Sequence, residues 1–212
     1  AQERLGKEGK LALFFVELDG IAHKFGLDSS EYKSYFSRLN GWVNDLYDKF
    51  KSIYPDGHIA VLSDHGMSEV KRIVHLDLEK EFSSSGGEHY AYFLDTTMLR
   101  IWYFDPEVKN ALESFLSNRD YGRLLTDQER VEFGITNKEW ADSIFLLNEG
   151  CVFDPSFLEK GHPLAMHGYH PELSWQKGIF LYSGPKSFIP QNPISALRSH
   201  DMLKEILSGG KS

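Results

Sequence analysis

The sequence has few of the features that mark disulfide-bonded, membrane-spanning or nucleic-acid-binding proteins. Its 212 residues include one cysteine, Cys151, so no disulfide can form within the chain. No apolar run reaches the roughly 18 residues that a membrane-spanning helix requires. Lys and Arg number 23 against 31 Asp and Glu, and the resulting net charge of −8 argues against a broad nucleic-acid surface. An acidic protein can still bind a phosphate ester where metal ions supply the positive charge.

The remaining composition is that of an ordinary globular protein. Hydrophobic residues make up 41% and charged residues 25% of the chain. The length suffices for one domain with a sizeable core, or for a core with a smaller inserted subdomain. No targeting segment is recognised, and the chain opens at Ala1 without a methionine, so the sequence assigns no compartment.

Apolar runs and helical spacing predict an α/β core. The run that begins at Leu11 is typical of a strand buried on both faces. A helix start at residues 28–31 leads into a long amphipathic helix that reaches Ile53. A second buried strand follows, and strand, helix, strand in this order predicts a parallel pair with a right-handed crossover. We expect the central sheet to hold three neighbouring or near-neighbouring strands, at residues 11–18, 58–63 and 178–183.

The pattern changes after Phe82, where residues 83–87 read Ser-Ser-Ser-Gly-Gly and predict a flexible loop. Two strands are expected next, at 89–94 and 97–104, and Asp105 should cap a helix that opens at Pro106.

Beyond that helix we expect a further strand at 143–147 and a last helix around Met202. The predicted organisation is a core over residues 1–82, a small α+β insertion over 83–160, and a return to the core over 161–212.

Three segments carry residues suited to metal binding. Asp19 and His23 lie four positions apart just past the first predicted strand, and one helical turn there would place both side chains on one face. Asp64 and His65 follow the second predicted strand within Ser-Asp-His-Gly-Met, where a glycine allows a tight turn. His167 lies in a late loop. Ligands of open α/β sheets bind beyond the carboxyl ends of strands, which is where the first two segments lie.

Each segment also has an ordinary structural interpretation. An aspartate after a strand often caps a helix or forms a turn, and an Asp and a His four residues apart can be a surface contact. The histidine-rich loop at 162–170 can be solvent-exposed. Taken together, the three segments favour a metal site. Two Asp/His sets at two strand ends and a late histidine supply the nitrogen and oxygen ligands that two borderline metal ions require.

The order of these segments resembles the type I phosphodiesterase/nucleotide pyrophosphatase family of the alkaline phosphatase superfamily. Residues 17–26 resemble its Asp-x-x-x-His-x-x-Gly segment, residues 63–67 match its Ser-Asp-His-Gly-Met segment, and residues 167–169 match its late His-Gly-Tyr segment. Residues 148–153 resemble part of the family's cap. The resemblance implies an alkaline-phosphatase-like central sheet flanked by helices, with a small α+β cap insertion.

The family pattern implies two divalent metal ions, zinc first and manganese as the alternative. Asp19, His23 and His167 would hold one ion, and Asp64 and His65 the other.

In the family, the second ion also takes an Asp and a Thr or Ser nucleophile from a segment upstream of the Asp19 motif. The sequence starts too close to Asp19 to contain that segment, so no catalytic nucleophile is assigned, and we expect a chain that lacks the N-terminal part of the domain. Thr96 and Thr97 are not substitutes, because they belong to a predicted hairpin. The chain alone is expected to be inactive.

The implied activity is hydrolysis of a phosphodiester or nucleotide pyrophosphate in a small-molecule substrate, through a covalent intermediate. We expect no nucleic-acid surface and no membrane segment in this chain. Phosphomonoesterase, phosphonate hydrolase, sulfatase and phosphomutase activities remain alternatives, because the same metal core serves all of them. A non-catalytic metal-binding module is another alternative. His170 could be an outer-shell group, although a solvated surface histidine is the favoured interpretation.

Overall fold

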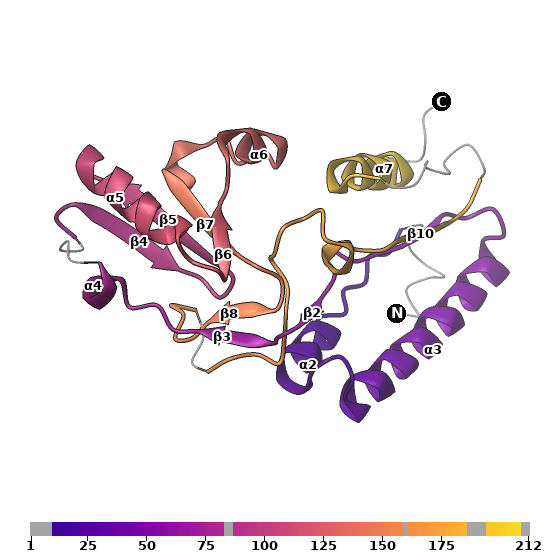
Figure 1. The fold of residues 1–212 in the computed structure, drawn as a ribbon. Coiled ribbons are helices and arrows are strands. Elements are labelled where there is room, and N and C mark those ends of the chain that lie inside the picture. Colours follow the sequence, from indigo (N-terminus) through magenta and orange to yellow (C-terminus); the bar gives the residue numbers. More distant parts are fainter. Residues whose placement is uncertain (1–9, 83–86, 159–160, 186–193, 209–212) are drawn as a thin grey trace. The chain divides into compact units, whose positions relative to one another are not determined.

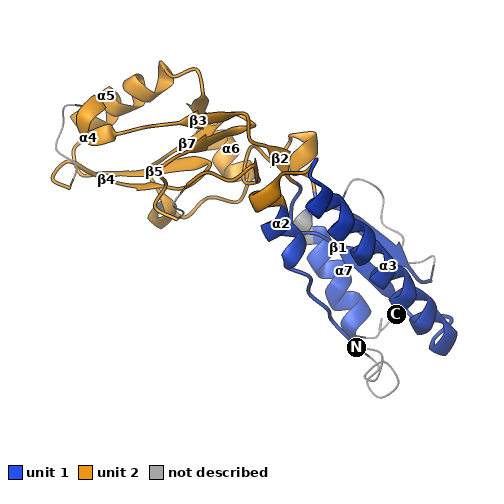
Figure 2. Ribbon diagram, turned by 90° about the horizontal axis from the view of Figure 1, so that it is seen from below, with its two compact units in different colours: residues 1–21, 28–66, 178–212 blue, residues 22–27, 67–177 orange. Residues whose placement is uncertain are grey.

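The computed structural model describes residues 10–82, 87–158, 161–185 and 194–208 (Figure 1). The fold is mixed α/β, as predicted. It divides into two compact units, which Figure 2 colours blue and orange. Unit 1 comprises residues 1–21, 28–66 and 178–212, and unit 2 comprises residues 22–27 and 67–177.

The described residues of unit 1 contain two complete helices, the start of a third, and a two-stranded sheet. Strand β1 (Ile59–Leu62) pairs antiparallel with β10 (Phe180–Ser183), with Ile59 opposite Ser183. Helix α3 (Ser30–Ile53) begins at the predicted place, because the Ser29 hydroxyl accepts a hydrogen bond from the Tyr32 N–H. Helix α7 (Ala196–Ser208) is the predicted last helix. The predicted neighbourhood of 58–63 and 178–183 is confirmed.

The predicted strand at residues 11–18 is wrong. Residues 10–16 form neither helix nor strand, and helix α2 (Glu17–Phe25) begins within the predicted strand. The side chains of Phe14 and Val16 are 89% and 74% exposed. A strand buried on both faces needs neighbours for its N–H and C=O groups, and β1 and β10 of the described chain pair with each other only. The predicted parallel strand–helix–strand unit is therefore not formed by the described residues.

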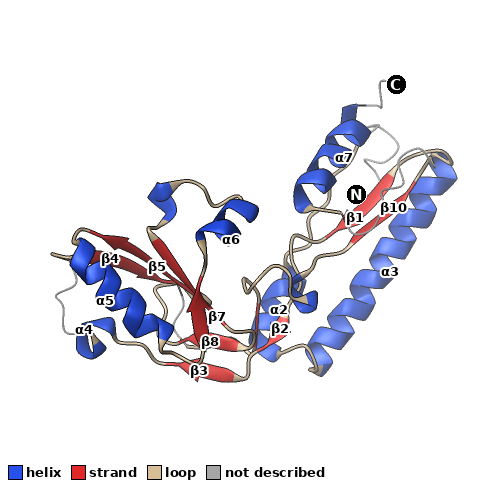
Figure 3. Ribbon diagram, turned by 45° about the horizontal axis from the view of Figure 1, so that its top comes forward, coloured by secondary structure: helices blue, strands red, loops and turns tan. Residues whose placement is uncertain are grey.

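Unit 2 is built on a four-stranded antiparallel sheet, red in Figure 3. Its strands in sheet order are β4 (Tyr90–Leu94), β5 (Met98–Tyr103), β7 (Ser143–Leu147) and β6 (Gly122–Leu124). Helix α5 (Pro106–Ser117) has Asp105 as N-cap and Pro106 in its first turn, as predicted. The hairpin of β4 and β5 and the strand at 143–147 are also confirmed.

Two short strand pairs complete unit 2. Strand β2 (Ser68–Glu69) pairs antiparallel with β9 (Ala165–Met166), and β3 (Arg72–Val74) pairs parallel with β8 (Cys151–Phe153). The short helices are α4 (Leu78–Glu81), α6 (Asp127–Glu132), η1 (Lys138–Trp140) and η2 (Ser174–Gln176). The predicted division at residues 82 and 160 stays a prediction, and most of the predicted loop at 83–87 lies outside the described residues.

The main core of unit 2 lies between its sheet and α5. Phe145, Leu112 and Leu116 have no exposed surface, and the rings of Tyr121 and Phe145 meet edge to face with centroids 5.9 Å apart. Among the described helices, none combines the length and the apolar character that a membrane span requires.

We expect Phe145→Ala to lower the free energy of unfolding of unit 2 by about 3–5 kcal/mol, because it opens a cavity in this core. Phe104→Ala is the matched control, since Phe104 is 62% exposed and its truncation should cost about 0.5 kcal/mol or less. Chemical denaturation followed by near-ultraviolet circular dichroism measures both values. Equal losses in the two variants would contradict the assignment of the core.

Candidate metal centre

Helix α2 carries the first two predicted ligands, Asp19 and His23, one turn apart. The acidic residues Glu17 and Asp19 occupy its first turn, and His23 and Lys24 occupy its last turn, which matches the direction of the helix dipole. The helix ends where Gly26 adopts φ +79° and donates its N–H to the Ala22 carbonyl. The predicted helical turn is therefore present, and the spacing places both ligands on one face.

The imidazole of His23 is oriented by the backbone of β9. Its Nδ1 atom lies 2.7 Å from the Ala165 carbonyl oxygen. Because a carbonyl oxygen can only accept, Nδ1 carries a proton and donates, and in the neutral ring the metal-binding lone pair is therefore on Nε2. The Leu164 N–H also donates to the His23 carbonyl at 2.8 Å. A residue 142 positions away in the sequence thus fixes the tautomer of His23.

His167 follows directly after β9, and its ring lies beside that of His23 with centroids 5.2 Å apart. One ligand atom from each of Asp19, His23 and His167 lies within 4.8 Å of the other two. Within the described part of the chain, this is the one group of three or more His, Cys, Asp or Glu side chains that meets this geometry. Two imidazoles and a carboxylate suit zinc, so these residues fit the ion that the sequence implied.

The backbone after His167 is held by side chains that the sequence analysis did not select. Gly168 has φ +85°, and its carbonyl accepts a hydrogen bond of 3.0 Å from the Thr97 hydroxyl. Tyr169 is 4% exposed and donates its hydroxyl to the Cys151 carbonyl at 2.9 Å. Burial raises the pKa of Tyr169, so this hydroxyl remains a donor. Thr97 thus supports the loop, a role that no spacing or motif indicates.

Asp64 and His65, the predicted ligands of the second ion, follow β1 in unit 1. The His65 Nδ1 atom lies 2.8 Å from the Gly66 carbonyl oxygen and donates to it, which leaves Nε2 free of its proton in the neutral ring. This Nε2 atom lies 3.5 Å from Oδ2 of Asp64. The two side chains therefore contact each other. Their role as ligands of one ion and their convergence with the other three ligands stay predictions.

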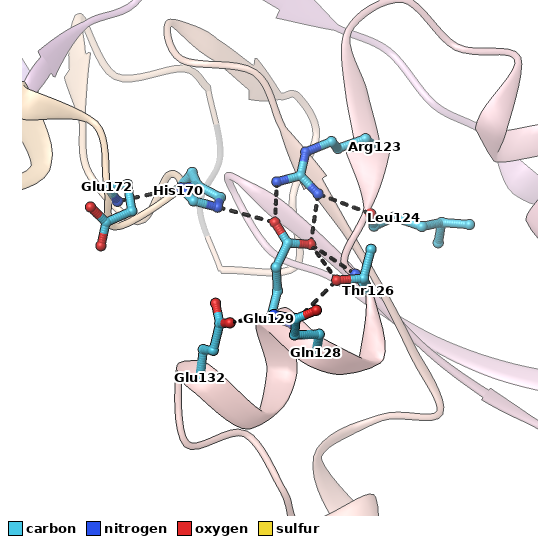
Figure 4. Close-up of polar contacts among 8 residues, drawn as sticks. All are labelled: Arg123, Leu124, Thr126, Gln128, Glu129, Glu132, His170 and Glu172. Carbon is cyan, nitrogen blue, oxygen red and sulfur yellow. Dashed lines mark hydrogen bonds and ion pairs between the residues drawn. The ribbon is translucent and has the colours of Figure 1, made fainter.

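His170 is not a freely solvated histidine, which corrects the favoured interpretation. Its Nε2 atom lies 3.3 Å from Oε1 of Glu129, and the Glu172 N–H donates to its Nδ1 atom (Figure 4). Its ring meets that of Phe133 edge to face, with centroids 5.2 Å apart. These contacts attach His170 to α6 and the turn that follows it.

Glu129 is the centre of this polar cluster. The Arg123 guanidinium donates to both of its carboxylate oxygens (Figure 4). Glu129 also completes the capping box of α6 with Thr126, whose N–H donates to it. The Arg123 hydrogen bonds, with smaller contributions from Thr126 and His170, hold the pKa of Glu129 far below its ordinary value.

Comparison with known proteins gives one family and a set of related folds. The model of the type I phosphodiesterase / nucleotide pyrophosphatase family matches residues 2–143, which include Asp19, His23, Asp64 and His65 and end before His167. No curated protein matches the chain.

Among solved structures, murine ectonucleotide pyrophosphatase / phosphodiesterase 5 is 23% identical to the chain with a TM-score of 0.64. The match covers 82% of this chain and 46% of the murine chain. An inactive variant of the same murine protein, solved in complex with AMP, gives the same values.

Phosphonoacetate hydrolase from Sinorhizobium meliloti 1021, in complex with phosphonoacetate, is 15% identical with a TM-score of 0.64, over 91% of this chain and 50% of the other. These likenesses show the fold. The chain spans about half the length of the structures that it matches.

Gly168→Ala tests the geometry of the loop after His167. An added Cβ would lie 2.9 Å from the Thr97 hydroxyl oxygen, in addition to the strain of a positive φ. Gly134→Ala is the matched control, because Gly134 has φ +74° and no atom within 4 Å of the added Cβ.

We expect Gly134→Ala to cost about 1–2 kcal/mol of stability, and Gly168→Ala to cost about 1–3 kcal/mol more. Denaturant titrations of the two variants measure the difference. An equal loss in both would show that Thr97 does not confine this loop.

Glu129→Gln tests the polar cluster of Figure 4. The folded-state pKa of Glu129 lies below its ordinary value of 4.5, so its stabilisation is present above that pH and is lost as the pH falls towards the folded-state pKa. We expect the variant to lose about 1 kcal/mol at neutral pH, with the difference from the wild type closing in acid.

Glu132→Gln is the control, since Glu132 lies on the same helix, is exposed, and accepts a hydrogen bond from Gln128. Thermal unfolding between neutral pH and pH 3 measures all three proteins. A difference that persists unchanged into acid would contradict an ionised Glu129 as the source of the stability.

Proposed function

Because the chain belongs to the type I phosphodiesterase / nucleotide pyrophosphatase family, we propose that it forms part of a metal-dependent hydrolase of phosphodiester or nucleotide pyrophosphate bonds. The observation that carries the proposal is the approach of Asp19, His23 and His167, from two segments far apart in the sequence, to within 4.8 Å of one another. Three protein ligands are the number that a catalytic zinc keeps while one position stays open.

The proposed ligand sets follow the sequence analysis. Asp19, His23 and His167 hold one divalent ion, and Asp64 and His65 contribute to the second. Zinc is the proposed ion, because imidazole nitrogens provide most of the ligands, and manganese is the alternative. Divalent ions in these places would neutralise the charge that develops on the ester oxygens during phosphoryl transfer.

The chain's own residues prepare this chemistry in three ways. The hydrogen bond from His23 to Ala165 holds the ring in the tautomer that presents Nε2. The first ligand set has one formal negative charge, from Asp19, so a divalent cation bound there leaves a net positive charge for an anionic phosphate. The support of Gly168 by Thr97 limits the movement of the loop that carries His167.

The substrate class rests on the family. The AMP complex of the murine protein, whose fold is similar, is consistent with a small nucleotide or phosphodiester substrate. We propose that the insertion at 83–160 supplies substrate contacts, since segments beside a fixed metal core are where specificity varies. The nucleophile is the Thr or Ser hydroxyl that the family pattern places upstream of Asp19, with a covalent intermediate formed on it.

Calorimetric zinc titration of the 212-residue chain tests the first ligand set. We expect one well-bound ion, and an affinity at least about 100-fold lower in His23→Ala and in His167→Ala, because each removes one of three ligands. His200→Ala is the control, since His200 lies on α7 with a side chain that is 61% exposed. If His167→Ala bound zinc as the wild type does, the ligand assignment would be wrong.

An aryl phosphodiester assay accompanies the titration. Turnover by this chain should be slight or absent, because positioned chemistry needs the hydroxyl that the family supplies from elsewhere. Turnover that is lost in Asp64→Ala would show that another nucleophile, or an activated water, serves in its place.

A further inference from the structure

Gln176, at the end of η2, has both ends of its amide fixed inside unit 2. Its side-chain nitrogen donates to the Ser68 hydroxyl at 3.0 Å, and its side-chain oxygen accepts the Tyr169 N–H at 3.1 Å. The Ser68 hydroxyl in turn donates to Glu149 at 2.5 Å. The Tyr169 N–H can only donate and the Glu149 carboxylate accepts, so the orientation of the amide between them is unambiguous.

This chain of hydrogen bonds is buried. Gln176 is 8% exposed, Ser68 6% and Tyr169 4%. A buried polar group that loses its hydrogen-bond partner is not compensated for its lost hydration. The network therefore strongly favours the one arrangement in which every group is paired. Buried glutamines are uncommon, and no apolar side chain of the same length could bind both partners.

The partners of Gln176 belong to the segments that bear the proposed metal ligands. Ser68 follows directly after the Ser-Asp-His-Gly-Met segment and lies opposite Met166, the residue before His167. Tyr169 is the second residue after His167. Gln176 therefore links β2 to the backbone that leaves His167, while Thr97 binds the intervening Gly168 carbonyl.

We propose that Gln176 is a positioning residue for His167, acting through the Tyr169 N–H rather than through the metal ion. The inference rests on the proposed function, because it requires His167 to be a ligand. Without the amide, the Tyr169 N–H loses its acceptor, and the backbone that leaves His167 loses a contact that fixes the direction of the His167 imidazole. Outer-shell groups of this kind typically change metal affinity by about 10–100-fold.

Gln176→Met tests the proposal, because methionine keeps the length of the side chain and removes both hydrogen bonds. We expect zinc affinity to fall about 10-fold. The visible absorption spectrum of the Co²⁺-substituted protein should also change, since it reports ligand geometry. Gln128→Met is the matched control, because Gln128 is exposed on α6 and its amide donates to the exposed Glu132 of the same helix.

Ser68→Ala separates positioning from stability. It removes two hydrogen bonds of the network, from Gln176 to Ser68 and from Ser68 to Glu149, and leaves the bond from the Tyr169 N–H to Gln176. We expect it to lower the unfolding temperature measured in EDTA, with zinc affinity within about 3-fold of the wild type.

If Gln176 had a purely structural role, Gln176→Met would lower the unfolding temperature and leave zinc affinity and the Co²⁺ spectrum unchanged. That result would overturn the proposal and leave the proposed function intact, provided that His167→Ala still weakens zinc binding.

A measurement without metal keeps the two proposals separate. The imidazole proton resonances of His167, assigned through His167→Ala, should shift in metal-free Gln176→Met and stay in place in Gln128→Met. Unchanged resonances in Gln176→Met would overturn the positioning role whatever the zinc titration gives. Wild-type protein that does not bind zinc through His167 would instead refute the proposed function and the inference that rests on it.

Discussion

The candidate metal centre depends on one short strand pair, β2 with β9, and above all on Ala165. Ala165 has no exposed surface, and it lies opposite Glu69 in the pairing. Its carbonyl accepts the proton of His23, and the Glu69 carboxylate accepts the N–H of Leu27, just after α2. Two residues on each strand therefore hold the end of α2 beside the segment that leads to His167. Bringing His23 and Ala165 together closes a loop of 142 residues, which costs conformational entropy that the buried contacts of unit 2 must offset.

Polar groups of residues 83–160, the predicted insertion, support this candidate centre. Thr97 comes from the turn between β4 and β5, and Cys151 from β8, so both belong to the rigid sheet framework of unit 2. The Thr97 hydroxyl donates to the Gly168 carbonyl, and the Cys151 carbonyl accepts a hydrogen bond from the Tyr169 hydroxyl. Sites held by strands keep their geometry better than sites held by loops alone. An insertion predicted to contact substrate thus also orders a loop that bears a proposed ligand.

The family match and the similarity of fold give different amounts of information about the function. The family match reaches residue 143 and includes four of the five proposed ligands. His167 lies beyond it, was proposed from the late His-Gly-Tyr segment, and lies close to Asp19 and His23 in the structure. The similar folds include both a nucleotide pyrophosphatase / phosphodiesterase and a phosphonoacetate hydrolase at the same TM-score, so the fold alone does not choose the substrate.

The sequence by itself determined the local features, which depend on contacts between residues close together in the chain. The Ser29 cap of α3, the Asp105 cap and Pro106 start of α5, and the β4–β5 hairpin follow from contacts within a few residues. The helical turn that joins Asp19 and His23 is equally local, and so is the adjacency of Asp64 and His65.

Only the tertiary structure decided which distant segments meet. The apolar run from Leu11 was predicted to be a strand, yet a strand exists only where another strand accepts its hydrogen bonds, and no periodicity encodes that partner. The contact of His23 with Ala165 and the bonds of Gln176 likewise join residues far apart in the sequence. Thr97 and Gln176 have no motif, because a single buried hydrogen bond to backbone can be made by any suitably placed side chain of the right length. Their roles follow from the packing of unit 2, which fixes those places after the chain has folded.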